Sequence, residues 1–240
     1  MIKVAIYNEF LHERSHEEVR AIYPDGIHMC IKQFLDAEDD IEVVNTFTLD
    51  NVDTLTRDVL DSVDVLIWWG HMAHEKVPDS VAADVQYAVL RGLGLIVLHS
   101  GHMSKPFRLL MGTTCTLTWR EGGDSERVWV VKPAHPIAKG IGRFLYLDRV
   151  ETYGEPFDVP EPDETVFVGG YSAGEVFRSG LCYKRGNGKV FYFQPGHETC
   201  PVYHHPGIQT VIKNAVRWAK SDYRVNDIPC PWVPAPGIEG

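Results

Sequence analysis

The sequence predicts a three-layer α/β fold, in which a mainly parallel sheet lies between two layers of helices. Three observations predict it. Short, almost wholly apolar runs recur through the first half of the chain, as in strands that are covered on both faces. A segment with helical hydrophobic spacing follows most of these runs, and no hairpin turn signal separates them. Alternation of this kind connects parallel strands through helical crossovers.

The first half is expected to contain four strands that alternate with helices. The strands are Ile2–Tyr7, Ile41–Phe47, Val63–Trp69 and Leu95–Leu98. The helices are one that opens at Pro24, one over Asp53–Asp61, one that Ser80 caps and Gly92 ends, and one over Met103–Met111. The segment before Pro24, which carries His12 and His16, is predicted to be a polar loop.

The second half has shorter apolar runs and more turn-forming residues, so the predicted fold includes a hairpin there. The sequence RGNG at 185–188 separates Leu181–Lys184 from Lys189–Gln194 and is a strong hairpin signal. Two further strands are expected at Val128–Val131 and Thr165–Val168, and Ile208–Lys220 has the pattern of a closing amphipathic helix. We therefore expect one domain over residues 1–220, followed by an irregular, proline-rich tail over residues 221–240.

Composition limits the classes of partner. The chain has 33 acidic and 23 basic residues, a net charge of -10, and no basic run, which argues against nucleic acid. It lacks both the run of about 20 apolar residues that a membrane span needs and the apolar start of a signal peptide. These features predict a cytoplasmic protein without a membrane partner. The apolar, proline-rich tail makes a homo-oligomer an expectation.

Histidines and carboxylates follow several of the predicted strands. Because parallel strands present their carboxyl ends at one edge of a sheet, these side chains are expected to lie together. They are Asn8, Glu9, His71, His99, His102, His197 and Glu198. Three imidazoles with a carboxylate and an open position suit a divalent transition metal, zinc above all. We therefore predict His71, His99 and His197 as metal ligands, with purely structural roles for single histidines as the alternative.

The turn after Leu95–Leu98, in the string LIVLHSGH, has the pattern of a strand-to-helix elbow. Such a turn projects one side chain above the sheet and needs a small residue two positions later. With His99 at the apex that position is Gly101, whereas with Ser100 it would be His102. We therefore expect His99 at the apex. A hydrolase that uses Ser100 with His197 and Glu198 is the disfavoured alternative.

Candidate substrate contacts are the polar and aromatic residues near these strand ends. They are Asn8, His12, Trp69, Ser100, His102, Trp119, Arg120, Tyr203 and His204. For Trp69, core packing is the alternative to a wall for a sugar ring. Trp119, Arg120 and Glu121 are expected in an irregular stretch after the elbow helix, where they can supply aromatic and charged contacts. Glu175 and Arg178 are expected to be polar pocket or interface residues.

The order of strands and the string LHSGH resemble the nucleophile turn of class I glutamine amidotransferases. In that fold, which has a flavodoxin-like three-layer arrangement, a cysteine stands where His99 stands here, and His197 and Glu198 match the downstream pair. Over residues 1 to about 220 the chain more closely resembles the trehalose-utilisation (ThuA-like) family. The matching strings are YNEFLHE, IYPDGIH, WWGHMAH, LHSGH, RVWVVKPAHPI, YGEPFDVP, YSAGEVFRSG and FYFQPGHET.

The missing elbow thiol argues against glutamine hydrolysis through a thioester. The ThuA-like resemblance implies trehalose or a related disaccharide, in a keto form that a partner sugar dehydrogenase makes. The resulting hypothesis is a metal-dependent hydrolase or lyase that opens the glycosidic bond, with His99, His197, Glu198 and Glu9 as its catalytic residues. The alternative is a non-catalytic sugar-binding or regulatory protein that retains a relic amidotransferase pocket.

Overall fold

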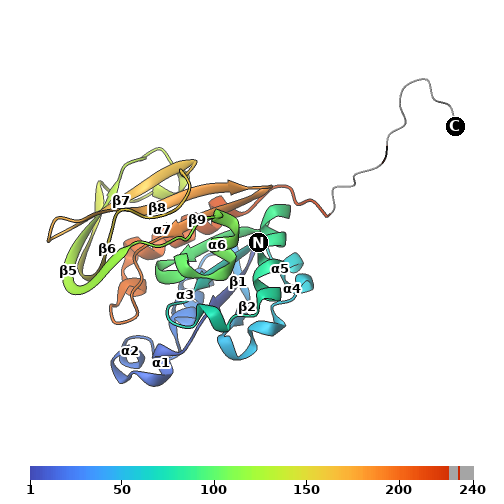
Figure 1. Cartoon of the computed structure of the whole chain (residues 1–240), viewed down its shortest axis with the longest axis horizontal. Helices are drawn as coiled ribbons and strands as arrows, with labels where there is room; N and C mark the ends of the chain where they lie inside the picture. The colour runs from blue at the N-terminus through green and yellow to red at the C-terminus, as the bar shows by residue number, and fades with distance from the viewer. Residues whose placement is uncertain (227–231, 233–240) are drawn as a thin grey trace.

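One sheet of nine strands runs through the computed structural model, which describes residues 1–226 and residue 232 (Figure 1). Its order is β2-β1-β3-β4-β9-β8-β7-β5-β6. The parallel part consists of β1 (Ile2–Asn8), β2 (Ile41–Phe47), β3 (Val65–Trp69), β4 (Gly94–Leu98) and β9 (Gly188–Phe193). The antiparallel part consists of β8 (Val176–Arg185), β7 (Glu164–Tyr171), β5 (Thr118–Val130) and β6 (Phe144–Gly154).

Helices pack on the sheet in two groups, and the predicted α/β class is confirmed. In one group, α3 (Ile27–Leu35) and α7 (Pro206–Ala219) contact each other and β1. In the other, α5 (Asp79–Arg91) contacts β9 and lies between α4 (Arg57–Ser62) and α6 (Lys105–Met111). Every residue of β3 and β4 is buried, as expected for strands covered on both sides.

Several helix boundaries differ from the prediction because local caps override the periodic pattern. The helix expected from Pro24 begins at Ile27, where Gly26 forms the N-cap with φ of 93°. Pro78, not Ser80, is the N-cap of α5. The helix expected over Asp53–Asp61 is divided into a 3-10 helix, Leu49–Thr54, and α4, and Thr48 forms a capping box with Asn51 at the start of the first piece.

Two segments predicted to be irregular have regular structure. The expected loop with His12 and His16 contains two short helices, α1 (His12–Ser15) and α2 (Glu17–Ile22). Trp119 and Arg120 lie in β5, which starts ten residues before the strand expected at Val128–Val131. Strand β6 was not expected, because its inward positions alternate with Phe144 and Tyr146, which are exposed apolar residues that hide the period of two.

The hairpin predicted around RGNG is confirmed as β8 and β9, which pair from Arg185 with Gly188 onward. Residues 221–226 have no helix or strand, and Val225 N donates to the carbonyl of Arg91. Most of the predicted tail, with Cys230, lies outside the described residues.

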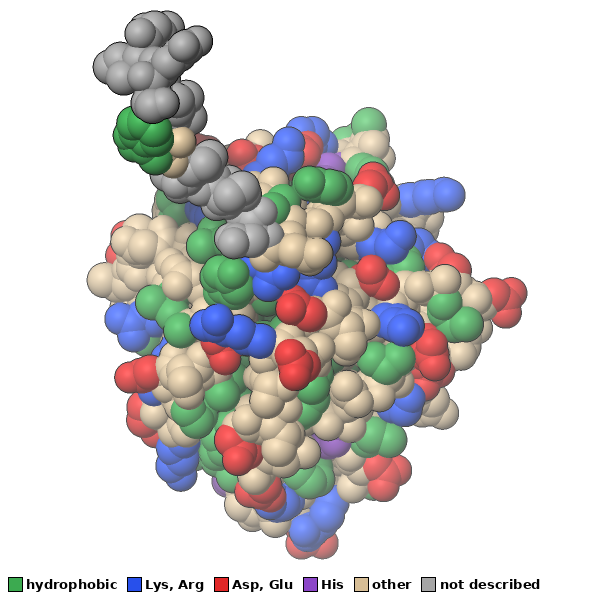
Figure 2. Space-filling view, turned by 90° about the vertical axis from the view of Figure 1, so that its right-hand side faces the viewer, with side chains coloured by type: hydrophobic (Ala, Val, Ile, Leu, Met, Phe, Trp, Pro, Cys, Tyr) green, Lys and Arg blue, Asp and Glu red, His purple; other side chains and the backbone are tan. Residues whose placement is uncertain are grey.

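Among the described residues, no helix is long and apolar enough to cross a membrane. The face drawn in Figure 2 intersperses acidic and basic side chains.

The elbow after β4 has the predicted geometry. His99 adopts φ of 52°, a left-handed conformation that non-glycine residues rarely take, and it begins a 3-10 turn, His99–Met103, before α6. A Cβ atom at Gly101 would lie 2.9 Å from Val97 Cγ1 and 3.3 Å from the carbonyl oxygen of Trp68. The apex is therefore His99, and the glycine two positions later is a steric requirement.

Replacing this glycine tests the elbow. We expect Gly101→Ala to lower the free energy of unfolding by about 1–3 kcal/mol, because the added methyl overpacks the turn. Gly142→Ala is the matched control, since a Cβ there meets nothing within 4 Å; its effect should stay within about 0.5 kcal/mol. Urea denaturation of both variants measures the difference, and an unchanged midpoint for Gly101→Ala would contradict the steric argument.

Candidate functional site

Three histidines and a glutamate converge where β3, β4 and β9 end. His71 follows β3, His99 follows β4, and His197 and Glu198 follow β9. Each offers one ligand atom, and these four atoms all lie within 4.8 Å of one another. His99, His197 and Glu198 are buried, while His71 is half-buried. The structure thus brings the three predicted ligands together because their strands are neighbours in the parallel part of the sheet.

The converging atoms face one another without hydrogen bonds. His71 Nδ1 lies 3.2 Å from Glu198 Oε2, and His197 Nε2 lies 3.8 Å from Glu198 Oε1. Neither contact has hydrogen-bond alignment, and His71 Nδ1, His197 Nε2 and Glu198 Oε2 are buried without a partner among the described residues. Buried polar atoms are nearly always paired, so this group has the character of an ion site.

The tautomer of His99 follows from its surroundings. Its Nδ1 lies 2.9 Å from the backbone carbonyl oxygen of Gln194, which can only accept, so Nδ1 carries the proton and donates. In the neutral ring, Nε2 then presents a lone pair 3.0 Å from Glu151 Oε2. Two acceptors at this distance need a proton or a cation between them.

Glu151 was not among the predicted site residues. It lies near the end of β6, a strand that sequence periodicity did not predict, and it is buried against the histidines. Its Oε2 also lies 4.0 Å from His197 Nε2. The string YGEPFDVP marks this region through the resemblance, but Glu151 itself lies at the break in the β5–β6 ladder, between the pairs Arg120 with Thr152 and Asp124 with Val150, which no sequence pattern indicates.

The charges of the group suit a cation. Burial, and then the neighbouring His99, lower the pKa of His197 to about 4, so its ring is neutral at pH 7. Burial opposes ionisation of Glu198, yet the nearby His71 holds the pKa of that carboxyl well below its usual range. Burial also lowers the pKa of His71, but the carboxylate of Glu198 reverses this and raises it overall.

Glu9 holds the loop of His71. Its carboxylate accepts three backbone N–H groups, from His71 at 2.9 Å, Met72 at 3.1 Å and Ala73 at 3.0 Å. This contact set makes Glu9 a positioning residue rather than one that meets substrate. Asn8 is also buried, and its amide donates to Glu13 at 2.7 Å.

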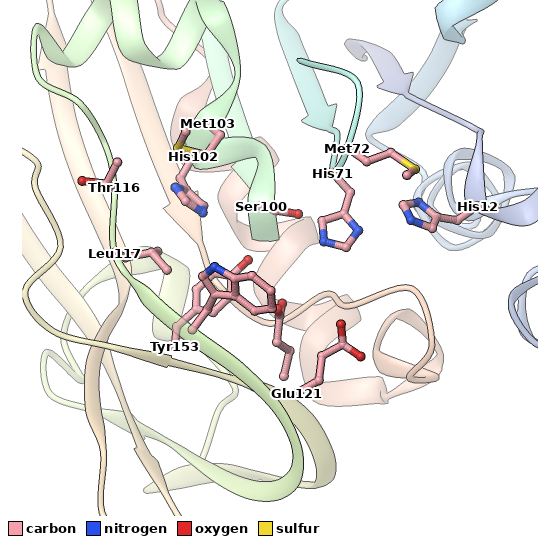
Figure 3. Close-up of a pocket in the computed structure, with 12 residues that line it drawn as sticks. His12, His71, Met72, Ser100, His102, Met103, Thr116, Leu117, Glu121 and Tyr153 are labelled. Atoms are coloured by element: carbon pink, nitrogen blue, oxygen red, sulfur yellow. The ribbon is translucent and has the colours of Figure 1, made fainter. Parts of the chain in front are cut away.

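A pocket of about 400 Å³ opens beside the converging donors (Figure 3). Four of the predicted substrate contacts line it: His12, Ser100, His102 and Trp119. In the close-up, His12 and His71 lie on one side and Thr116 and Leu117 on the other. Glu121, expected as a charged contact, also lines it, whereas Tyr153 and Glu151 are lining residues that were not predicted.

The remaining predicted contacts do not line this pocket. Trp69 is buried and donates from Nε1 to the carbonyl of Gly196 at 3.2 Å. Tyr203 is buried behind the same glycine, where a Cβ would lie 2.2 Å from its hydroxyl. His204 stacks on Tyr23. Arg120 pairs with side chains outside this pocket, namely Asp124 and Glu175.

His102 and Ser100 offer fixed polar groups to a ligand. His102 Nδ1 donates to the carbonyl of Cys115 at 2.7 Å, and burial lowers its pKa to about 3, so the ring is neutral with Nε2 as an acceptor. Ser100 Oγ donates to the carbonyl of Gly70 at 3.2 Å rather than to His197. This contact does not prepare Ser100 as a nucleophile.

Comparison with known proteins agrees with this class of α/β protein. Solved structures with the same fold include one described as a ThuA-like protein from Parabacteroides merdae, with 13% identity, a TM-score of 0.64 and coverage of 95% of this chain and 93% of that one. Another is a ThuA-like protein from Bacteroides uniformis, with 16% identity, a TM-score of 0.65 and coverage of 92% of each chain. A third is a cytoplasmic protein from Salmonella typhimurium, with 11% identity, a TM-score of 0.63 and coverage of 92% and 100%.

The family itself is shown by sequence. A family model named ThuA and described as trehalose utilisation matches residues 3–219, so the chain belongs to the ThuA family. Among curated proteins, none matches the chain significantly. The expected family and the expected α/β fold are therefore confirmed.

Behind His99 lies a fully buried carboxyl group, Glu126. Its Oε1 accepts from Ser179 Oγ at 3.2 Å, and the amide nitrogen of Gln194, turned toward it, lies 3.2 Å from its Oε2. A Cβ at Gly169 would lie 2.2 Å from Oε1, so that glycine leaves room for the carboxyl. Burial raises the pKa of Glu126 to about 8, so its neutral form supports the residue that orients His99.

This raised pKa predicts a pH-dependent stability. The pKa of the Glu126 carboxyl is 4.5 in the unfolded chain, whereas in the fold burial raises it to about 8. Its contribution is therefore full below pH 4.5 and is lost as pH rises to about 8. The glutamine variant Glu126→Gln cannot ionise, so the difference in the free energy of unfolding between variant and wild type should shift in favour of the variant as pH rises from about 5 to about 8. We expect this shift to be roughly a few kcal/mol. Denaturant unfolding at both pH values measures it, and a pH-independent difference would contradict the assignment.

Proposed function

We propose that this protein is a metal-assisted enzyme that opens the glycosidic bond of a trehalose-related sugar, by elimination or hydrolysis. The carrying observation is the group of unpaired donors, His71, His99, His197 and Glu198, beside a pocket of ligand size. Zinc is the cation that this donor set favours, because imidazole nitrogens and a carboxylate oxygen are its usual ligands. Neutral imidazoles and an ionised carboxylate are the forms that bind a metal.

When bound, the cation would polarise a carbonyl or hydroxyl oxygen of the sugar. The chain supplies the orientation around it. The carbonyl of Gln194 holds the His99 ring, and Thr199 Oγ1, 2.8 Å from His197 Nδ1, holds the ring of His197. Glu9 fixes the backbone of His71. Ser100 and His102 line the pocket where they can hydrogen-bond sugar hydroxyls.

The substrate class comes from the family. Trehalose utilisation supports a disaccharide, and we propose its keto form, supplied by a partner sugar dehydrogenase. Trp119, 64% exposed at the pocket, provides a flat face for a sugar ring. We further propose a cytoplasmic homo-oligomer, in line with the composition and with the cytoplasmic relative from Salmonella typhimurium.

Glutamine hydrolysis is not part of the proposal. His99 occupies the elbow where an amidotransferase needs a thiol, and burial raises the pKa of Cys115 and Cys200 above the ordinary value, which disfavours the reactive thiolate. The competing function is a non-catalytic sugar-binding or regulatory protein. It predicts sugar binding without turnover and without a requirement for metal.

Metal content tests the proposal. Purified protein should bind zinc in a stoichiometric amount, and the double variant His71→Ala/His197→Ala should lose it, since two donors are removed from the group. His16→Ala is the matched control because this histidine is exposed and lies outside the group. Zinc affinity should fall as pH drops from 8 to 6, because His71, with its raised pKa, must release a proton.

Turnover is measured on the same samples with keto-trehalose, by following release of the monosaccharide. We expect zinc-loaded wild type to cleave it and the double variant to be inactive. Zinc retained by the double variant, or absent from the wild type, would overturn the metal site. Zinc bound without turnover would favour the binding protein.

A further inference from the structure

A second group of donors lies on the open side of the first. Glu121, Glu151 and His197 each offer a ligand atom, and these atoms lie within 4.8 Å of one another. Glu121 is exposed and lines the sugar pocket, whereas Glu151 and His197 are only 5% and 4% exposed. The group is thus open on one side and buried on the other, like a site that an ion enters from the pocket.

Two buried atoms of this group have no partner. Glu151 Oε2 and His197 Nε2 make no hydrogen bond with the described residues, although both are inaccessible to water. They lie 4.0 Å apart, which is too far for a hydrogen bond. An acidic cluster alone would be unremarkable on a protein of this charge, but unpaired buried atoms directed into it need a ligand.

The local backbone brings Glu121 into this position. Strand β5 pairs regularly with β6 from Thr118 to Arg120 and resumes only at Asp124, so Glu121 lies at the start of an irregularity in the ladder. Gly123, with φ of 70°, completes this turn of the chain. Bulges of this kind redirect a side chain beside a site.

We infer that Glu121, Glu151 and His197 form a second site for a divalent transition cation, adjacent to the one proposed above. The inference rests on the proposed metal site, which it extends from one ion to two. The two groups together contain six residues: His71, His99, His197, Glu198, Glu121 and Glu151. With His197 assigned to the outer ion, each ion has three protein ligands and an open position, as in catalytic zinc sites.

The two groups adjoin each other at one contact. His99 Nε2 belongs to the inner group and Glu151 Oε2 to the outer, and they are 3.0 Å apart. Paired catalytic metals lie about 3.5–4 Å apart, so both ions of such a pair lie within one cluster of side chains. Arg149 lines the hollow beside Glu121 and Glu151, so a positive charge lies near the outer ion. The outer site should therefore be the weaker of the two.

The test is a zinc titration that needs no sugar. Full-length protein freed of metal is titrated with zinc by calorimetry, and bound zinc is counted by mass spectrometry after desalting. The wild type should bind two equivalents, the second more weakly. Glu121→Gln should keep the tight equivalent and weaken binding of the second by at least about tenfold. Tenfold is roughly the lower end of the loss in metal affinity caused by mutating a residue that only supports a ligand, so loss of a direct ligand should cost at least as much.

Glu161→Gln is the matched control, because it removes the same charge from an exposed glutamate outside both groups. It should bind zinc like the wild type, and circular dichroism should show all three proteins folded. One equivalent in the wild type, or a second that Glu121→Gln leaves unchanged, would overturn the second site alone. Loss of both equivalents in Glu121→Gln would also overturn it, since Glu121 would then belong to a single site. No zinc in the wild type would overturn the proposed function as well.

Discussion

The hydrogen bond from His99 to the backbone carbonyl of Gln194 is the interaction on which the site depends. It joins the elbow after β4 to the end of β9, and it fixes the proton of His99 on Nδ1. Because that proton is on Nδ1, the lone pair of Nε2 points to the space where the Glu151 carboxylate and the other metal-ligand atoms converge. The buried, neutral carboxyl of Glu126 contacts the side-chain amide of Gln194, so a buried polar group helps to position the residue that orients His99.

At the other end of the site, Glu9 positions the loop that carries His71. Glu9 uses its carboxylate to satisfy three backbone N–H groups of the loop after β3, which would otherwise be free to move. His71 then faces Glu198, whose charge raises the pKa of the imidazole. The charged residues near the strand ends thus divide into those whose atoms converge, such as Glu198, and those that hold the others in place, such as Glu9.

Much of the architecture could be predicted because the parallel strands are largely apolar, and β3 and β4 are apolar throughout. The apolar runs identify β1 to β4, and the hairpin signal identifies β8 and β9. The elbow with His99 at its apex was predicted because the position two residues later needs a small side chain. The close approach of Val97 to Gly101 confirms this. Strand β6 escaped prediction because exposed Phe144 and Tyr146 mask its alternation, and Glu151 was missed with it. Glu121 was expected only as a charged contact, because the bulge that brings it to Glu151 and His197 has no simple residue period.

By itself, the sequence determined the α/β class, the positions of the buried strands along the chain and the histidines at their ends. Local periodicity and residue size carry that information. Only the tertiary structure decided which carboxylates reach those histidines. Glu151 and Glu121 arrive on antiparallel strands far along the chain, while Asn8 and Tyr203 turn into the interior. Such choices depend on sheet register and on the direction of each side chain, which are settled by packing between distant segments.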